Sequence, residues 1–191
     1  SGAIINDGDY EILADKEFLR HKMYQPVFRK KNEPTSCFIL FMILEGDTKN
    51  SIKLYIDSFK CSYSDKPKGE GLKMLVALAN YINVLAKQQG LKCSIIELSA
   101  LPIGEDTDYQ TFSNDLLNLV NYYKSIGFKY SDDEMKDEDL DEYELNGVSM
   151  KANFNSFLKK YRSLLTGGKK RSSRKKGNKK NPKRTYKNKK R

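Results

Sequence analysis

The chain has 191 residues, and its 35 Lys or Arg against 25 Asp or Glu give a formal net charge of +10. No apolar stretch approaches the roughly 18 uncharged residues of a membrane-spanning helix, and the N-terminus lacks a basic region followed by a hydrophobic one. These features argue against a membrane protein and favour a soluble, intracellular one.

The first third of the chain begins with a weak pattern. A short strand is expected at Tyr10 to Leu13 and a helical turn around Lys16 to Met23. From Ser36 to Ser62, two runs rich in Ile, Phe, Leu and Tyr are separated by Gly46, Asp47 and a polar triplet. This arrangement predicts a β-hairpin.

The two arms of this hairpin carry different patterns. The first arm is apolar on both faces, which is typical of a central strand that is covered on both sides. In the second arm Ile52, Leu54 and Ile56 alternate with more polar residues, so we expect one covered face.

A polar loop, SDKPKGEG, separates the hairpin from a predicted amphipathic helix of about five turns that ends at a Gly90 cap. Apolar residues recur in it at helical spacing: Leu72, Leu75, Val76, Ala79, Ile82 and Ala86. Residues 93–100, CSIIELSA, predict a short buried strand. The order strand, glycine loop, helix, strand implies a right-handed crossover and parallel pairing of the two strands.

A second helix is expected from an N-cap at about Ser113, through Tyr123, to a C-cap at Gly127. The segment FKYSD follows, and nine acidic residues then lie between positions 132 and 144. Residues 147–154, GVSMKANF, predict a last strand, and FNSFLKKYRSLL predicts a final helical piece.

The end of the chain has a different composition from the rest. Fourteen Lys or Arg and no acid follow position 168, which leaves 21 basic against 25 acidic residues before it, or a net charge near −4. Residues 167–191 have almost nothing apolar to bury and should be disordered. We therefore predict one domain over residues 1–166 and a polybasic tail over 167–191.

Cysteine and histidine exclude several classes of site. Cys37, Cys61 and Cys93 are odd in number, widely spaced and placed in apolar runs, so we expect buried free thiols, with neither a disulfide framework nor a zinc site. The only histidine, His21, lies between two basic residues, which indicates a surface position. Ser–His and Cys–His mechanisms would depend on this one residue.

Two segments together resemble a known family. The loop before the first helix contains KGEGLKML, and the second helix ends in NLVNYYKSIGFKY, with the buried strand between them. In this order and spacing they resemble the GNAT superfamily of acetyl-CoA-dependent N-acetyltransferases, over roughly residues 36 to 155. The resemblance implies an α/β fold with a mixed, mostly antiparallel sheet, a central parallel pair and helices on both faces.

The glycine loop is the first part of this resemblance. The family motif reads Arg or Gln, x, x, Gly, x, Gly or Ala. Lys66 with Gly69 and Gly71 satisfies both glycines, whereas Lys68 with Gly71 puts Lys73 where a small residue is usual, and in both registers Lys replaces Arg or Gln. Glycines before a helix let backbone N–H groups approach a phosphate, although such turns also occur for purely structural reasons.

The resemblance implies that this loop binds the diphosphate of acetyl-CoA through Lys66, Lys68, Gly69, Glu70, Gly71, Leu72 and Lys73. It also implies that Tyr123, four residues before Gly127, reaches the sulfur of the departing thiolate. The alternative for Tyr123 is an aromatic core residue that closes the end of the helix.

Acetylation of an amine needs a base, because an amine with a pKa of about 10.4 is almost fully protonated at neutral pH. A carboxylate acting as general base typically contributes about 10²- to 10⁴-fold. We favour Glu97 for this role; Asp57, Glu105, Asp106 and Asp108 are the other candidates. Each of them also suits a solvated or ion-paired surface carboxylate.

The two charged segments, residues 132–144 and 169–191, allow several functional interpretations. The acids at 132–144 suit attraction of a cationic acceptor such as a lysine side chain or polyamine, binding of the basic tail, or a solvated loop. Residues 169–191 suit nucleic acid, through phosphate neutralisation, or a localisation signal. The competing interpretation of the whole chain is an inactive acetyltransferase-like or other α/β scaffold that binds nucleic acid through this tail. The Lys-, Arg- and Asn-rich composition is similar to that of proteins of large DNA viruses.

Overall fold

The computed structural model describes residues 3–7, 9–13, 25–32, 37–61, 69–102, 109–142 and 147–166. The strands are β1 (Ala3–Asp7), β2 (Tyr10–Leu13), β3 (Val27–Lys30), β4 (Cys37–Glu45), β5 (Ser51–Cys61), β6 (Lys92–Ala100), β7 (Lys129–Tyr130) and β8 (Val148–Asn153). The helices are α1 (Glu70–Gln88), α2 (Tyr109–Ser125) and α3 (Phe154–Tyr161), with short 3-10 helices η1 (Asp137–Glu142) and η2 (Arg162–Leu164). No helix in these ranges is long and apolar enough to cross a membrane.

The strands form one eight-stranded sheet in the order β1-β2-β3-β4-β5-β6-β8-β7. All neighbours in it are antiparallel except β5 and β6, which are parallel and are joined by α1. The predicted fold class, a mixed and mostly antiparallel sheet with one central parallel pair, is confirmed. Strands β1 and β3 extend the sheet at the N-terminal end, where the sequence pattern is weak.

The predicted hairpin corresponds to β4 and β5, and its polar turn is closed by the Gly46 N–H, which donates to the Ser51 carbonyl at 2.8 Å. Ile52, Leu54 and Ile56 are buried on one face, as expected. In β4, however, burial alternates: Cys37 and every second residue after it are buried, but the residues between them are only half-buried. Full cover of both faces of β4 is therefore not found among the described residues.

Helix α1 follows the predicted periodicity and buries Leu75, Ala79 and Ile82 completely or almost so. Its C-terminal end is a Schellman motif, because the Leu91 N–H donates to the Ala86 carbonyl at 2.8 Å while Gly90 adopts a left-handed φ of 69°. The expected glycine cap is confirmed.

Helix α2 starts at Tyr109, earlier than predicted. Ser113 lies inside the helix, so its assignment as the N-cap is wrong; the residues before it continue the helical backbone although they lack a clear apolar period. At the other end, Gly127 has φ 105° and the Phe128 N–H donates to the Tyr123 carbonyl at 3.0 Å. This Schellman motif brings the Tyr123 and Phe128 rings together at 5.6 Å.

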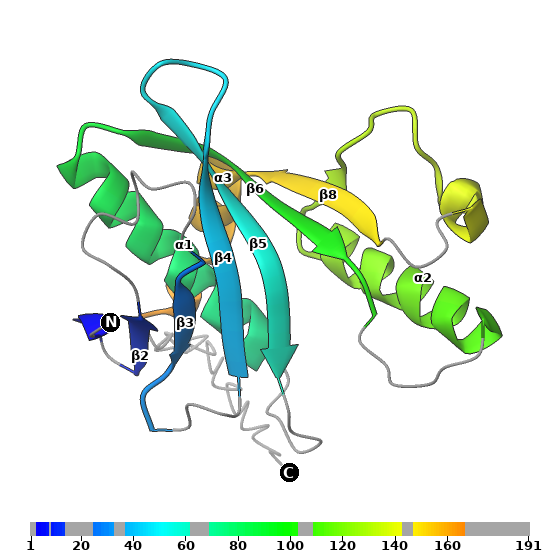
Figure 1. The fold of residues 1–191 in the computed structure, drawn as a ribbon, viewed down its shortest axis with the longest axis horizontal. Helices are drawn as coiled ribbons and strands as arrows, with labels where there is room; N and C mark the ends of the chain where they lie inside the picture. The colour runs from blue at the N-terminus through cyan, green and yellow to red at the C-terminus, as the bar shows by residue number, and fades with distance from the viewer. Residues whose placement is uncertain are drawn as a thin grey trace, which may run out of the picture.

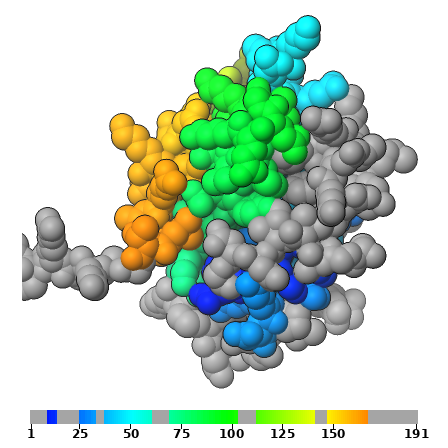
Figure 2. Space-filling model, turned by 90° about the vertical axis from the view of Figure 1, so that its left-hand side faces the viewer, coloured from blue at the N-terminus to red at the C-terminus, as the bar shows by residue number. Residues whose placement is uncertain are grey.

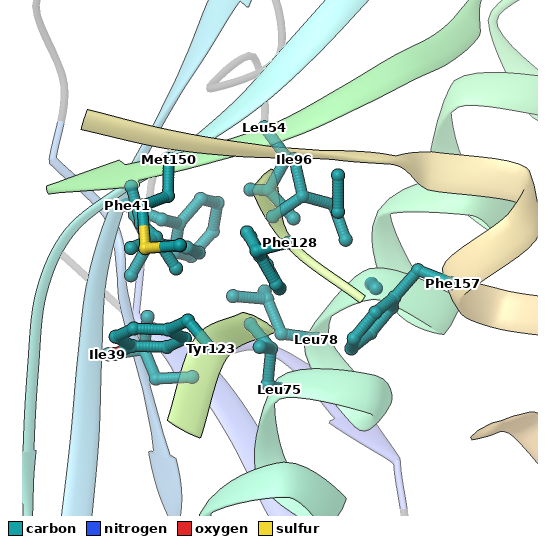
Figure 3. Close-up of a cluster of buried hydrophobic side chains, with 14 of the residues drawn as sticks. Ile39, Phe41, Leu54, Leu75, Leu78, Ile96, Tyr123, Phe128, Met150 and Phe157 are labelled. Atoms are coloured by element: carbon teal, nitrogen blue, oxygen red, sulfur yellow. The ribbon is translucent and has the colours of Figure 1, made fainter. Parts of the chain in front are cut away.

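One hydrophobic core joins the sheet to all three helices. Figure 3 shows Leu75 and Leu78 of α1 gathered with Tyr123, Phe128 and the α3 residue Phe157. The Phe128 and Phe157 rings meet edge to face at 5.9 Å. The described helices thus contribute to one layer on one side of the sheet. The helical turn expected at 16–23 lies outside the described residues.

The cysteines do not all behave as expected. Cys93 is a buried free thiol, and burial raises its pKa to about 12. Cys37 is disulfide-bonded, so the prediction of free thiols is wrong there. Its position in β4 is opposite Cys61 in the β4–β5 register. Spacing along the chain does not reveal such a register, because a hairpin pairs residues that are far apart in sequence.

Candidate functional site

The parallel pair β5–β6 comes apart before its strands end. The register runs from Ser51 opposite Lys92 to Ile56 opposite Leu98, while β5 continues to Cys61 and β6 to Ala100. Figure 1 shows β5 continuing downwards while β6 turns away to the right, alongside β8. Backbone groups on this edge of β5 beyond Ile56 therefore face a gap and have no ladder partner on β6.

A cleft of about 320 Å³ occupies this gap. Its walls come from β5, from the end of β6 and from α2: Ile56, Asp57, Ser58, Phe59, Lys60, Ser99, Leu101, Leu119 and Tyr123. Ile56 belongs to the face of the sheet that packs on the helices, whereas Ser99 alternates with the buried Leu98 and Ala100 and belongs to the other face. Residues from both faces of the sheet thus contribute to the walls of the cleft.

The N-terminus of α1 lies at the wall of this cleft. A Cβ added to Gly71 would come within 3.2 Å of the ring of Phe59, which lines the cleft. Gly69 is the N-cap, with φ 94° and no side-chain cap, and the first N–H that bonds back into the helix is that of Lys73, to the Gly69 carbonyl at 3.0 Å. The preceding N–H groups are the unsatisfied donors that favour an anion at a helix start.

The other loop residues named from the resemblance are placed differently. Glu70 turns to the strands: its carboxylate pairs with Lys30 Nζ at 2.7 Å and accepts a hydrogen bond from the Tyr10 hydroxyl at 3.4 Å. Burial alone would raise the pKa of Glu70, but the bond to Lys30 and its charge outweigh it and lower that pKa. Leu72 packs against the core.

Lys73 does not line the cleft between β5 and β6; it lines a different cavity, between α1 and strands β2 and β3. Lys66 and Lys68 lie outside the described residues. Of the predicted phosphate-binding loop, Gly69 and Gly71 lie at the start of α1, with Gly71 against Phe59, while the side chains of Glu70 and Lys73 turn to the strands and to the other cavity.

Tyr123 lies in the opposite wall of the cleft. Its side chain is only 8% exposed, and its ring packs on Tyr122 and Phe128. Burial, with a smaller contribution from Tyr122, raises its pKa to about 12. This raised pKa keeps the Tyr123 hydroxyl protonated at neutral pH. Among the described residues the hydroxyl has no hydrogen-bond partner, so it is available to a group that enters the cleft.

Asp57 and Glu97 are the two candidate bases that lie within the described residues. Asp57 is the extra residue of a bulge in β5, where the register passes from Leu40 opposite Ser58 to Phe41 opposite Ile56. It is exposed and lines the cleft. Its Oδ2 accepts a hydrogen bond from Gln25 Nε2 at 3.1 Å.

Glu97 is not among the residues that line the cleft. It alternates with the buried Ile96 and Leu98, and its Oε1 accepts a hydrogen bond from Ser149 Oγ at 3.3 Å. The geometry therefore brings Asp57, and not Glu97, into one cleft with Tyr123. The remaining candidates at positions 105, 106 and 108, and His21, lie outside the described residues.

The acidic segment uses several of its carboxylates internally. Asp137 accepts a hydrogen bond from the Tyr130 hydroxyl at 2.8 Å and pairs with Lys124. Asp133 pairs with Lys129 at 2.7 Å and lies 3.7 Å from Lys151 Nζ. These pairs tie η1 and its neighbours to the body of the domain. None of the described acids at 132–142 lines the cleft.

Sequence reasoning missed most of the cleft walls. Phe59, Ser58, Ser99 and Leu119 appear in the sequence as ordinary strand or helix residues. The available signal was the length of the second hairpin arm, which runs well past the alternating Ile52–Ile56 segment and therefore past what one short parallel neighbour can pair. Among the described residues, no group of three or more His, Cys, Asp or Glu is placed to hold a metal ion.

No family model matches this chain, and no curated protein does. Solved structures to which it is similar include the AtaT–AtaR complex bound to DNA, with a TM-score of 0.48 and 12% identity over 80% of this chain and 98% of that one.

Two further similar structures are an acetyltransferase of the GNAT family from Staphylococcus aureus Mu50 and Tetrahymena GCN5. The first has a TM-score of 0.39 and 11% identity over 76% of this chain and 68% of that one. The second has a TM-score of 0.36 and 12% identity over 69% of each chain. At these scores and identities the similarity carries no argument about chemistry, and none of it bears on the expected viral origin.

Proposed function

We propose that this chain is an acetyl-CoA-dependent N-acetyltransferase that acts on a cationic amine. One observation carries the proposal: the cleft where β5 and β6 part has the glycine-flanked start of α1 in contact with one wall and the hydroxyl-bearing Tyr123 in another. A helix start suited to an anion thus lies behind one wall of the cleft and a proton donor in another wall, which suits a long cosubstrate with a diphosphate and a thioester at its two ends.

The helix start would hold the diphosphate. Its first N–H groups have no partner within the helix, and the positive end of the helix dipole favours negative charge there. The Glu70 carboxylate would oppose this, but Lys30 compensates its charge. Apolar side chains at Ile56, Phe59 and Leu119 suit the uncharged arm that links the diphosphate to the sulfur.

Asp57 is the residue we assign to deprotonation of the amine. In the reaction the amine nitrogen forms a bond to the acetyl carbon, the bond from that carbon to sulfur breaks, and one proton leaves the nitrogen. Asp57 is the carboxylate in the cleft wall, and Gln25 holds its Oδ2. It would take the proton directly or through one water, which is the usual reach of a general base.

Tyr123 would stabilise the departing thiolate. A thiol with an ordinary pKa near 8.5 leaves readily, and a tyrosine with a pKa of about 12 is a weaker acid than that thiol. Complete proton transfer from Tyr123 is therefore uphill, and its contribution is a hydrogen bond to the developing negative charge. Its role is to assist the reaction without being indispensable.

Calorimetric titration of the full chain with acetyl-CoA, followed by a screen of amine acceptors that includes spermidine and a lysine peptide, tests the proposal. We expect saturable binding and release of free coenzyme A that depends on the amine. Gly71→Val, whose side chain would collide with Phe59, should weaken the binding of acetyl-CoA. Val84→Ala, an exposed change on the same helix, is the matched control and should leave it unchanged. No binding to the parent chain would refute the proposal, and binding without turnover would indicate a non-catalytic scaffold.

A second candidate function rests on the charge distribution. The fourteen basic and no acidic residues after position 168 suit neutralisation of nucleic-acid phosphates. Binding to a random DNA duplex should weaken steeply with salt and should disappear when residues 167–191 are removed. Equal binding by the truncated chain would contradict this function.

A further inference from the structure

A second cavity of about 220 Å³ lies on the flank of α1 that faces β2 and β3, and we call it the flank cavity. Figure 2 shows this side of the molecule, with α1 in green between η2 in orange and β2 and β3 in blue. Its lining includes Tyr10, Phe28, Lys73, Ala77, Asn80 and Tyr81. Its volume corresponds to about seven liquid water molecules, so it has room for more than a single ion.

The strand side of the flank cavity is aromatic. The rings of Tyr10 and Phe28 stack with centroids 5.1 Å apart and planes 20° apart. Both residues are more than nine-tenths buried, so the rings are held in place by the core. On the helix side the short side chain of Ala77 leaves room opposite them. This geometry favours a flat ring over a branched aliphatic ligand.

Asn80 is the polar group that this cavity does not satisfy. Its Oδ1 is buried and has no hydrogen-bond partner among the described residues. A buried acceptor without a donor destabilises the folded state. Among the described residues, the other buried side-chain oxygen or nitrogen without a partner is Gln89 Oε1. Gln89 is at the C-cap of α1 and does not line the flank cavity. The unpaired Asn80 Oδ1 beside this cavity can accept a hydrogen bond from a ligand that enters it.

The charges around the flank cavity nearly compensate one another. Lys73 brings one positive charge and Asp9 one negative charge. The Glu11 carboxylate, which also lines the cavity, is held by Arg29 Nε at 2.7 Å. The cavity therefore suits a ring without net charge.

We propose that the flank cavity binds the base of a purine nucleoside, with its ring against Tyr10 and Phe28 and its edge paired with Asn80. A carboxamide offers a donor and an acceptor in one plane, which is the pattern that asparagine uses to pair with N6 and N7 of adenine. The two-ring base suits the volume and the flat aromatic wall.

This purine has two chemical sources. Lys73 lines the flank cavity, and its N–H bonds to the carbonyl of Gly69 at the start of α1. The cavity therefore lies beside the diphosphate site proposed above, so the base could belong to a free nucleoside or to the nucleotide end of coenzyme A. The second source rests on the proposed function, whereas the first does not.

The experiment is a titration of the ¹⁵N-labelled full chain with adenosine, followed by amide chemical shifts. We expect saturable shifts in α1 around Ala77 to Tyr81 and in β2. The analogue N6,N6-dimethyladenosine, which has the same rings but no exocyclic N–H, should bind more weakly. Asn80→Leu should weaken adenosine binding by about five- to hundredfold, while Asn118→Leu, an exposed change on α2, should leave it unchanged.

A second variant protects the test from a folding failure. Ala77→Leu fills the flank cavity and keeps Asn80, so it should also remove adenosine binding. Adenosine that binds Asn80→Leu or Ala77→Leu as tightly as the parent chain, or that shifts signals only around Tyr123, would overturn the proposal. The absence of any binding at millimolar adenosine would overturn it as well.

Saturating coenzyme A separates the two sources. If adenosine is displaced, the flank cavity holds the base of the coenzyme; if its affinity is unchanged, the cavity is a separate nucleoside site. A chain that binds adenosine at the flank cavity but does not bind acetyl-CoA refutes the proposed acetyl transfer and leaves this inference standing.

Discussion

The two halves of the β5–β6 pair show how one strand serves two purposes. In the first half, from Ser51 to Ile56, the strands are hydrogen-bonded and Leu54 is fully buried beneath α1. In the second half the ladder stops, and Asp57 and Lys60 line an open cleft. A bulge at Asp57 marks the boundary between the halves. Packing between β5 and β6 therefore stabilises the first half, whereas the second half pairs with β4 alone and has an open edge on the side of β6.

The largest effect on the proposed reaction is expected at the boundary itself. Asp57→Asn should reduce amine acetylation at pH 7 by about 10²- to 10⁴-fold, because the amide cannot accept the proton. The residual rate should rise about tenfold per pH unit towards pH 9, as the free amine becomes more abundant. Steady-state kinetics over this pH range measure both effects. Glu97→Gln, outside the cleft, is the control, and a greater loss in it than in Asp57→Asn would reverse our assignment.

The comparison also predicts different costs in stability for similar truncations. Leu54→Ala, in the paired half, should lower the free energy of unfolding by about 2–5 kcal/mol, because it leaves a cavity in a closed core. Leu119→Ala, in the cleft wall, should lower it by only about 1 kcal/mol, because its side chain is only partly buried. Urea denaturation measures both values. Equal losses would mean that the cleft is as tightly packed as the core.

A smaller effect is expected from the hydroxyl of Tyr123. Tyr123→Phe should reduce the turnover number by roughly tenfold, less than a typical general acid contributes, because the thiolate is a good leaving group. Acetyl-CoA binding should change little. Tyr122→Phe is a matched control, since Tyr122 is 41% exposed and does not line the cleft. A Tyr123→Phe variant as fast as the parent chain would remove this residue from the mechanism.

The smallest effect concerns alkaline stability. Tyr123 has a pKa of about 12 in the folded chain against about 10 when unfolded. A raised pKa favours the neutral form in the folded state, so this contribution is complete below pH 10 and is lost as the pH rises from 10 to 12. Tyr123→Phe should therefore flatten the alkaline limb of the stability curve, measured by thermal unfolding against pH. An unchanged limb would indicate that the side chain is hydrated in solution.

Local patterns predicted most elements, because each depended on residues close in sequence. The spacing of Leu75, Ala79 and Ile82 defined α1, and the glycines at 90 and 127 marked two helix ends, where only a left-handed backbone closes the motif. The N-cap at Ser113 failed because a serine before an apolar period also occurs inside helices. The disulfide at Cys37 was missed because strand register is not visible in spacing.

The sequence by itself determined the main elements from β4 to α3, the parallel pair around α1 and the two segments that suggest acetyl transfer. Only the tertiary structure decided that the first of these segments meets the cleft wall at Gly71 and Phe59, that Asp57 and not Glu97 shares the cleft with Tyr123, and that Lys73 faces another cavity. The physical reason is that periodicity reports which face of an element is buried. The point where two strands part depends on twist and on a bulge, which involve residues distant along the chain.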